Sequence, residues 1–207
     1  MPSPEITPAH SYEPRAASGH VNLMVDTLIA NMRPEDLRAI MRTLLATHSP
    51  ALASAFTDIA RARLVQINAQ ALPPSSTVFV TTSPSGLSKP APSLEEVLKR
   101  ARSLYGAGMG FASLSLLASI VRDTWGRRWE AEGEMIDALT MIDADITQAL
   151  QSSREELEGG RIADLAAARA AAAELREALK GSDAEVTTWG GEFPFERGAA
   201  SMDHWKF

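Results

Sequence analysis

Cysteine is absent from the 207 residues of the chain, and aromatic residues make up only 6% of them. The lack of cysteine excludes disulfide bonds, thiolate catalysis and cysteine-ligated zinc, and it suits a reducing compartment. Residues 1–20 also lack the charged and then apolar layout of a secretory signal. We therefore expect an intracellular protein without a disulfide framework.

Basic residues are also in short supply. Twenty lysines and arginines stand against 26 aspartates and glutamates, which gives a net charge of −6. A nucleic-acid-binding protein normally carries a basic excess that neutralises phosphates. We therefore expect no nucleic-acid partner, although arginine pairs such as Arg61 and Arg63 form local basic spots.

Motifs typical of catalytic or metal sites are missing as well. None of the four histidines has another histidine or a carboxylate at a clear metal spacing. Asp143 and Asp145 are two residues apart, which places them roughly 200° apart on a helix, so we interpret both carboxylates as solvated. No serine lies in a GxSxG motif. The sequence predicts no catalytic residue, no cofactor and no metal ligand.

Apolar residues recur at helical spacing from residue 22 to residue 66. Pro34 and Ser49-Pro50 mark two helix starts, because proline suits the first helical position and serine suits the N-cap. The pattern predicts a three-helix unit over residues 21–70, with joints short enough to pack neighbouring helices together. We expect Leu44 and Phe56 to be buried on facing sides of the second joint.

Two segments before the second helical region are predicted to be irregular. Residues 1–20 contain prolines and no apolar period, which indicates a disordered lead. Residues 71–92 are rich in proline, serine and threonine, which indicates a linker. Its Val78-Phe79-Val80 is interpreted as a short extended piece packed on the helices, and we expect no sheet there.

Helical periodicity resumes at Ser93 and predicts a helical bundle over residues 93–181. Ser93 and Glu96 have the spacing of a capping box. Residues 103–121 contain no charged side chain, which favours a buried helix over a membrane segment because three glycines and several serines dilute the apolar run. The glycines of GAGMGF, residues 106–111, predict a kink or close packing, since no strand precedes them as in a phosphate-binding loop.

A long helix is predicted from Trp125 to the glycine pair Gly159-Gly160. An alanine-rich helix with similar apolar spacing follows and is predicted to end at Gly181. A tight joint between two such helices is typical of an antiparallel hairpin. The fold class predicted for the whole chain is therefore all-α, with a three-helix N-terminal unit and a second helical unit that ends in a long antiparallel hairpin.

Residues 182–207 form an irregular tail that carries five large aromatic residues. Disordered segments are normally depleted in such residues, so the tail has reason to dock. One interpretation is that it covers its own bundle, with the alanine-rich helix as the nearest surface. The other is that it anchors a partner protein. The aromatic residues concerned are Trp189, Phe193, Phe195, Trp205 and Phe207.

Residues 28–52, LIANMRPEDLRAIMRTLLATHSPAL, resemble the helical entry region of the fungal nuclear proteasome-tethering factors. The resemblance consists of a short helix, an acidic-started amphipathic helix and a His-Pro junction followed by leucine, although Ser49 is inserted between His48 and Pro50. It implies helices that contribute to dimerisation, a following helical bundle and a nuclear location. The lysine-rich arm of that family has no counterpart in residues 1–88, because Lys89 is the first lysine.

These observations favour a non-catalytic helical adaptor or scaffold that acts through protein–protein contacts, in the nucleus or cytoplasm, as a homodimer formed through residues 22–66. The alternative is a peripheral membrane or small-ligand-binding helical bundle that uses residues 103–121. A third is an enzyme whose site one sequence does not disclose. The residues predicted to bind the partner protein are apolar or aromatic: Leu37, Ile40, Met41, Leu44, Trp189, Phe193, Phe195 and Trp205.

Overall fold

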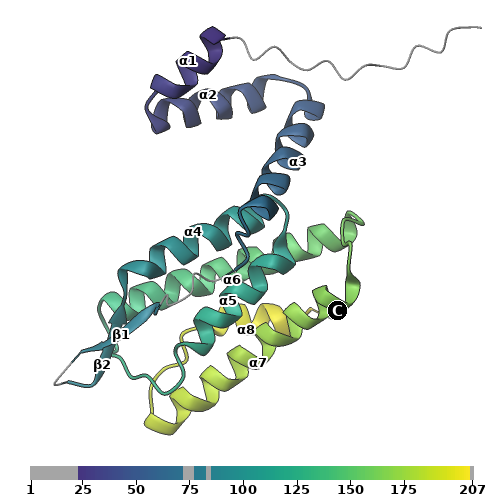
Figure 1. Cartoon of the computed structure of the whole chain (residues 1–207). Coiled ribbons are helices and arrows are strands. Elements are labelled where there is room, and N and C mark those ends of the chain that lie inside the picture. Colours follow the sequence, from purple (N-terminus) through teal and green to yellow (C-terminus); the bar gives the residue numbers. More distant parts are fainter. Residues whose placement is uncertain (1–22, 72–76, 83–84, 206–207) are drawn as a thin grey trace, which may run out of the picture. The chain divides into compact units, whose positions relative to one another are not determined.

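The structure is a computed structural model that describes residues 23–71, 77–82 and 85–205 (Figure 1). The chain is 71% helical, and its described part holds eight helices and one two-stranded sheet, which confirms the predicted all-α helical bundle. It divides into two compact units, Met1–Pro50 and Ala51–Phe207. The predicted disordered lead lies outside the described residues.

The described part of the first unit consists of α1 (Leu23–Asn31) and α2 (Pro34–Thr47). The second helix begins as predicted, with Pro34 at its start and two acidic residues in its first turn, where they face the positive end of the helix dipole. No residue of α2 is buried. The expected burial of Leu44 is therefore wrong, because 28 residues are too few to enclose a core by themselves.

The second unit contains the remaining elements. They are α3 (Pro50–Gln66), β1 (Phe79–Thr82), β2 (Leu87–Pro90), α4 (Pro92–Gly106), α5 (Gly110–Arg122), α6 (Glu134–Glu158), α7 (Leu165–Trp189) and α8 (Glu196–Asp203). The sequence predicts that α3 packs with α1 and α2, but α3 belongs to the same compact unit as the bundle. Leu64 packs against the core, and Arg61 donates to the Ala107 carbonyl at 2.6 Å. Phe56, on the outer part of α3, is 41% exposed, so its expected burial is wrong as well.

The centre of the bundle is α5, which packs on α4, α6 and α7 (Figure 1). Nine of its 13 residues are buried, as the uncharged stretch 103–121 predicts. Gly159-Gly160 connects α6 to α7 as expected, but α5 lies between these two long helices. α6 and α7 therefore pack mainly on α5 and not on each other as in the predicted hairpin, and the apolar side chains of α5 fill the space between them.

Three helix boundaries differ from the sequence-based expectation. The capping box is not formed, because α4 begins at Pro92, and the Ser93 hydroxyl donates instead to the Thr77 carbonyl at 2.6 Å. The long helix begins at Glu134 and not at Trp125: the residues before it form a turn and an irregular segment, and Gly133, with φ of 111°, directly precedes the helix. The alanine-rich helix continues through Gly181 to Trp189.

Trp125 bears on both helix boundaries that the sequence placed too early, the start at Trp125 and the end at Gly181. Its ring lies against α7, where a Cβ added to Gly181 would come within 2.6 Å of the Trp125 Cε2 atom. The indole Nε1 donates to the Ala178 carbonyl at 3.2 Å. Gly181 therefore gives space to a ring from the loop, and the apolar spacing of Trp125 reflects that contact rather than a helix.

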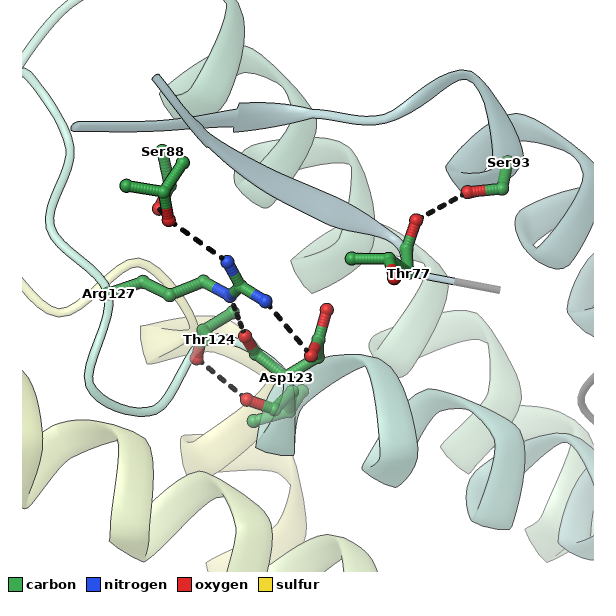
Figure 2. A network of polar contacts seen from close by, with 8 residues as sticks. Thr77, Ser88, Ser93, Asp123, Thr124 and Arg127 are labelled. Carbon is green, nitrogen blue, oxygen red and sulfur yellow. Dashed lines mark hydrogen bonds and ion pairs between the residues drawn. The ribbon is translucent and has the colours of Figure 1, made fainter. Parts of the chain in front are cut away.

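A β-hairpin occupies part of the segment predicted to be a linker. β1 and β2 pair antiparallel, with Phe79 opposite Pro90, and the expectation of no sheet is wrong. Phe79 is fully buried, so the extended piece does pack on the helices as expected. Figure 2 shows Arg127 between the hairpin and the end of α5: it donates to the Thr81 hydroxyl at 3.4 Å and pairs with Asp123 at 3.2 Å.

The described part of the tail, which extends to Trp205, contributes to the core. It continues α7 and then forms α8, which packs mainly on α6 and only lightly on α7. The docking expected on the alanine-rich helix α7 therefore occurs mostly on α6. A reason is that Gly198 lets α8 approach α6 closely, since a Cβ there would lie 2.7 Å from Ile146 Cγ2.

Gly110→Ala should lower the free energy of unfolding by about 1–3 kcal/mol, the usual cost of an overpacked core. The added Cβ would lie 2.6 Å from the Ser153 Cα atom, which is backbone and cannot rotate away. Gly106→Ala is the matched control, because a Cβ at that position meets no atom within 4 Å. Urea unfolding of both variants checks this, and equal stabilities would contradict the close α5–α6 contact.

Candidate interaction surfaces

The four partner-binding residues predicted in α2 lie on one apolar face of that helix, as their spacing requires. Ile40 is 47% exposed, while Leu37, Met41 and Leu44 are half-buried. The preceding helix adds Leu28 and Ile29 at 55% and 49% exposure. The described part of the first unit thus keeps its large apolar side chains at least partly in contact with solvent.

The four partner-binding residues predicted in the tail have a different environment. Phe195 is fully buried and Trp205 is 8% exposed, so neither offers a surface to a partner. Trp205 stacks on Phe111 at 5.6 Å between ring centroids. The half-buried Trp189 and Phe193 meet Trp129 and Phe195 edge-on, at 5.2 and 5.9 Å. The tail therefore docks on its own chain, which was one of the two interpretations.

Asp145 is a buried carboxylate that holds α6 to α4. Its two oxygens accept hydrogen bonds from Arg102 Nε at 3.1 and 3.0 Å, and Arg102 Nη2 approaches to 2.9 Å. The Tyr105 hydroxyl donates to the same carboxylate at 2.9 Å. Burial, together with the hydrogen bond to this carboxylate, raises the pKa of Tyr105 to about 12. A charge removed from water is tolerated here because several donors surround it.

Asp143 performs the same role toward the tail. The backbone N–H of Gly198 donates to one of its oxygens at 2.7 Å, and Arg197 Nε donates to the other at 3.0 Å. The carboxylate itself is almost fully buried, although the arginine is largely exposed. α8 is therefore attached to α6 by a charge-assisted hydrogen bond to its first turn.

The interpretation of Asp143 and Asp145 as solvated is wrong. The prediction that they do not converge is correct, since each binds a different neighbouring helix. A signal was present in the sequence: Asp143 interrupts the apolar spacing of α6 beside Ile142 and Ile146, both of which are fully buried. A carboxylate in a core position needs a partner, but the sequence does not say that the partners lie 40 to 55 residues away.

Glu156 of α6 is a third carboxylate near the core, and it lies against the start of α5. It accepts a hydrogen bond from the backbone N–H of Phe111 at 3.2 Å, in the position where a helix offers unpaired donors. Burial raises the pKa of Glu156, and the hydrogen bonds to the backbone oppose that shift without cancelling it. The carboxylates in and beside the core are thus engaged by arginine, tyrosine or backbone donors of the fold.

Among residues 23–71, 77–82 and 85–205, no three histidine, aspartate or glutamate side chains gather as they would around a metal ion. A cavity of about 420 Å³ lies between the hairpin and the start of α6, with Glu130, Glu132 and Glu134 on its wall. A second, of about 400 Å³, is an apolar groove between α3 and α4 next to Phe56.

In the described part of the chain, no helix has both the length and the apolar composition that crossing a bilayer requires.

Comparisons with known proteins give no match: no protein-family description fits the chain, and no curated protein or solved structure is significantly similar to it.

Asp145→Asn should lower the free energy of unfolding by about 1–3 kcal/mol, because it weakens the buried hydrogen bonds with Arg102 and Tyr105. It should also lower the pKa of Tyr105 from about 12, since the Asp145 carboxylate contributes to that shift. Chemical unfolding and an ultraviolet titration of the phenol measure the two effects, with Tyr12→Phe as the background so that one tyrosine is observed.

Asp183→Asn provides the control, because Asp183 is exposed on α7. Its effect should be about 0.5 kcal/mol or less. Identical losses in the two variants would show that Asp145 contributes no more than a surface charge.

Proposed function

We propose that the chain is a non-catalytic helical scaffold that self-associates through α1 and α2. The observation that carries this proposal is the apolar face of the first unit, where Ile40, Leu28 and Ile29 are about half exposed and α2 buries no residue. Burying one such side chain contributes roughly 1.5–3 kcal/mol, so a face of this kind favours association.

A second copy of the chain is the occupant that the first unit favours. Two short helices supply half of a four-helix bundle, and two identical faces pair about a two-fold axis. The charges of residues 23–50 are balanced, with three arginines against one glutamate and two aspartates. Two copies therefore meet without net repulsion, and one ion pair, Arg33–Asp36 at 2.8 Å, already forms within the unit.

The second unit supports the scaffold proposal in another way. Its bundle has one apolar core that includes the tail, and its buried carboxylates hold helices together. The α5 side chains that a lipid- or ligand-binding role would use are packed inside this core. The resemblance of residues 28–52 to dimerising helices of nuclear tethering factors agrees with self-association and leaves a nuclear or cytoplasmic location as part of the proposal.

Ile40→Asp should convert the full-length dimer into a monomer, because a carboxylate placed in the interface would lose its water. Ala39→Asp is the matched control: it adds the same charge to the neighbouring residue, which is exposed on the opposite side of α2. Light scattering at several micromolar concentrations gives the masses. A wild-type chain that stays monomeric at high micromolar concentration would refute self-association, and a dimeric Ile40→Asp variant would refute the proposed face.

A further inference from the structure

A polar pocket of about 420 Å³ lies within the second unit, between α3, the end of α4 and the far half of α6. Its wall carries hydrogen-bonding side chains from elements far apart in the sequence: Thr57, Arg61, Gln148, Gln151, Glu155 and Arg161. Two arginines against one glutamate leave this wall with one positive charge in excess, although the whole chain has a net charge of −6. The side chains that line the pocket are therefore positive in sum, unlike the whole chain, and Asp58 pairs with Arg61 from outside this lining.

The two arginines converge on Gly108, which lies in the turn between α4 and α5. A Cβ added at this residue would lie 2.8 Å from Arg61 Nη2 and 3.6 Å from Arg161 Nη2. The two Nη2 atoms are therefore no more than the sum of these distances, 6.4 Å, apart. Gly108 has φ of 71°, a conformation that favours glycine, and a side chain at this position would occupy the space beside the guanidinium groups.

The hydrogen bonds that hold each guanidinium group in place leave some of its N–H donors unused. Arg61 uses Nε for the Ala107 carbonyl and Nη1 for Asp58, at 2.6 and 3.2 Å. Its Nη2 makes no hydrogen bond within the described residues. Arg161 donates from Nη2 to the Glu155 carbonyl at 3.0 Å, and no described carboxylate lies within 4.0 Å of it. Both groups are thus oriented by backbone carbonyls. Asp58 partly balances the charge of Arg61, whereas Arg161 has no ion-pair partner among the described residues.

The carboxylates nearby are directed elsewhere. Glu155 accepts a hydrogen bond from Gln151 Nε2 at 3.0 Å, and Glu156 binds the Phe111 N–H at the start of α5. The charge of Glu156 attracts both arginines while its hydrogen bond goes to the Phe111 N–H. An anion placed between the two guanidinium groups would relieve their mutual repulsion further. Guanidinium groups present pairs of N–H donors that match the oxygens of a carboxylate or phosphate.

We propose that this pocket binds an organic oxyanion, with its phosphate or carboxylate group held between Arg61 and Arg161 above Gly108. The volume of about 420 Å³ exceeds the needs of a bare ion and falls in the range of small-molecule sites. The amide groups of Gln148 and Gln151 line the remaining space and are suited to polar parts of such a ligand. This site is separate from the apolar face of α1 and α2 and does not depend on self-association.

The experiment is a titration of the ¹⁵N-labelled full chain with inorganic phosphate, phenyl phosphate and benzoate at constant ionic strength, with chloride as the reference salt. We expect saturable shifts of the Gly108 amide signal that chloride does not produce. Arg61→Gln and Arg161→Gln should each weaken binding at least tenfold. Arg63→Gln removes the same charge from the same helix but lies outside this pocket, so it should leave the affinity unchanged.

The outcomes separate the possible sources of the anion. Tighter binding of phenyl phosphate or benzoate than of inorganic phosphate supports an organic ligand that fills the pocket. Tightest binding of inorganic phosphate, shifts that do not saturate, or shifts that persist in both arginine variants would overturn the proposal. Arg161 is exposed, so its variant provides the test even if Arg61→Gln unfolds the chain.

Discussion

The two carboxylates of α6 are the constraint on which the second unit depends. Asp145 and Asp143 are separated by one residue and point to different sides of the helix, toward α4 and α8. A buried carboxylate without donors would cost several kcal/mol, so each can be tolerated only where its partners are in place. The register of both neighbouring helices on α6 is therefore specified by polar contacts as well as by the apolar core.

Close approach between helices is the second constraint. Gly110 allows α5 to approach the backbone of α6, and Gly198 allows α8 to approach Ile146 on the other side. Gly181 admits the ring of Trp125 in the same way. Glycine thus allows a neighbouring helix or ring to approach closely at three contacts between elements.

The sequence was sufficient for features that depend on neighbouring residues. The start of α2 at Pro34, the stop at Gly159-Gly160 and the burial of most of α5 all follow from local composition and period, and the structure has each of them. The errors concern contacts between distant residues. Gly181 stays helical because Trp125 packs there, and the Ser93 hydroxyl donates to the Thr77 carbonyl instead of capping α4.

The candidate sites show the same difference between features set by neighbouring residues and contacts between distant ones. The apolar face of α2 could be predicted from its spacing, because a helix face needs only its own residues. The sequence could not say whether Phe195 and Trp205 are buried or free, because a tail rich in aromatic residues fits both cases. The answer depends on whether the bundle offers a surface on which the tail can pack. The pair Arg61 and Arg161 lies a hundred residues apart, so no local pattern could have joined them.

The sequence positions of the partners of α6 have a consequence for the order in which the bundle assembles during synthesis. Arg102 and Tyr105 precede Asp145 in the chain, so that carboxylate can be satisfied as soon as α6 exists. Asp143 must wait for Arg197 and Gly198, more than 50 residues later. Until the tail has been synthesised, Asp143 lacks these donors and α6 lacks the cover of α8, so these contacts of the bundle can form only at the end of synthesis.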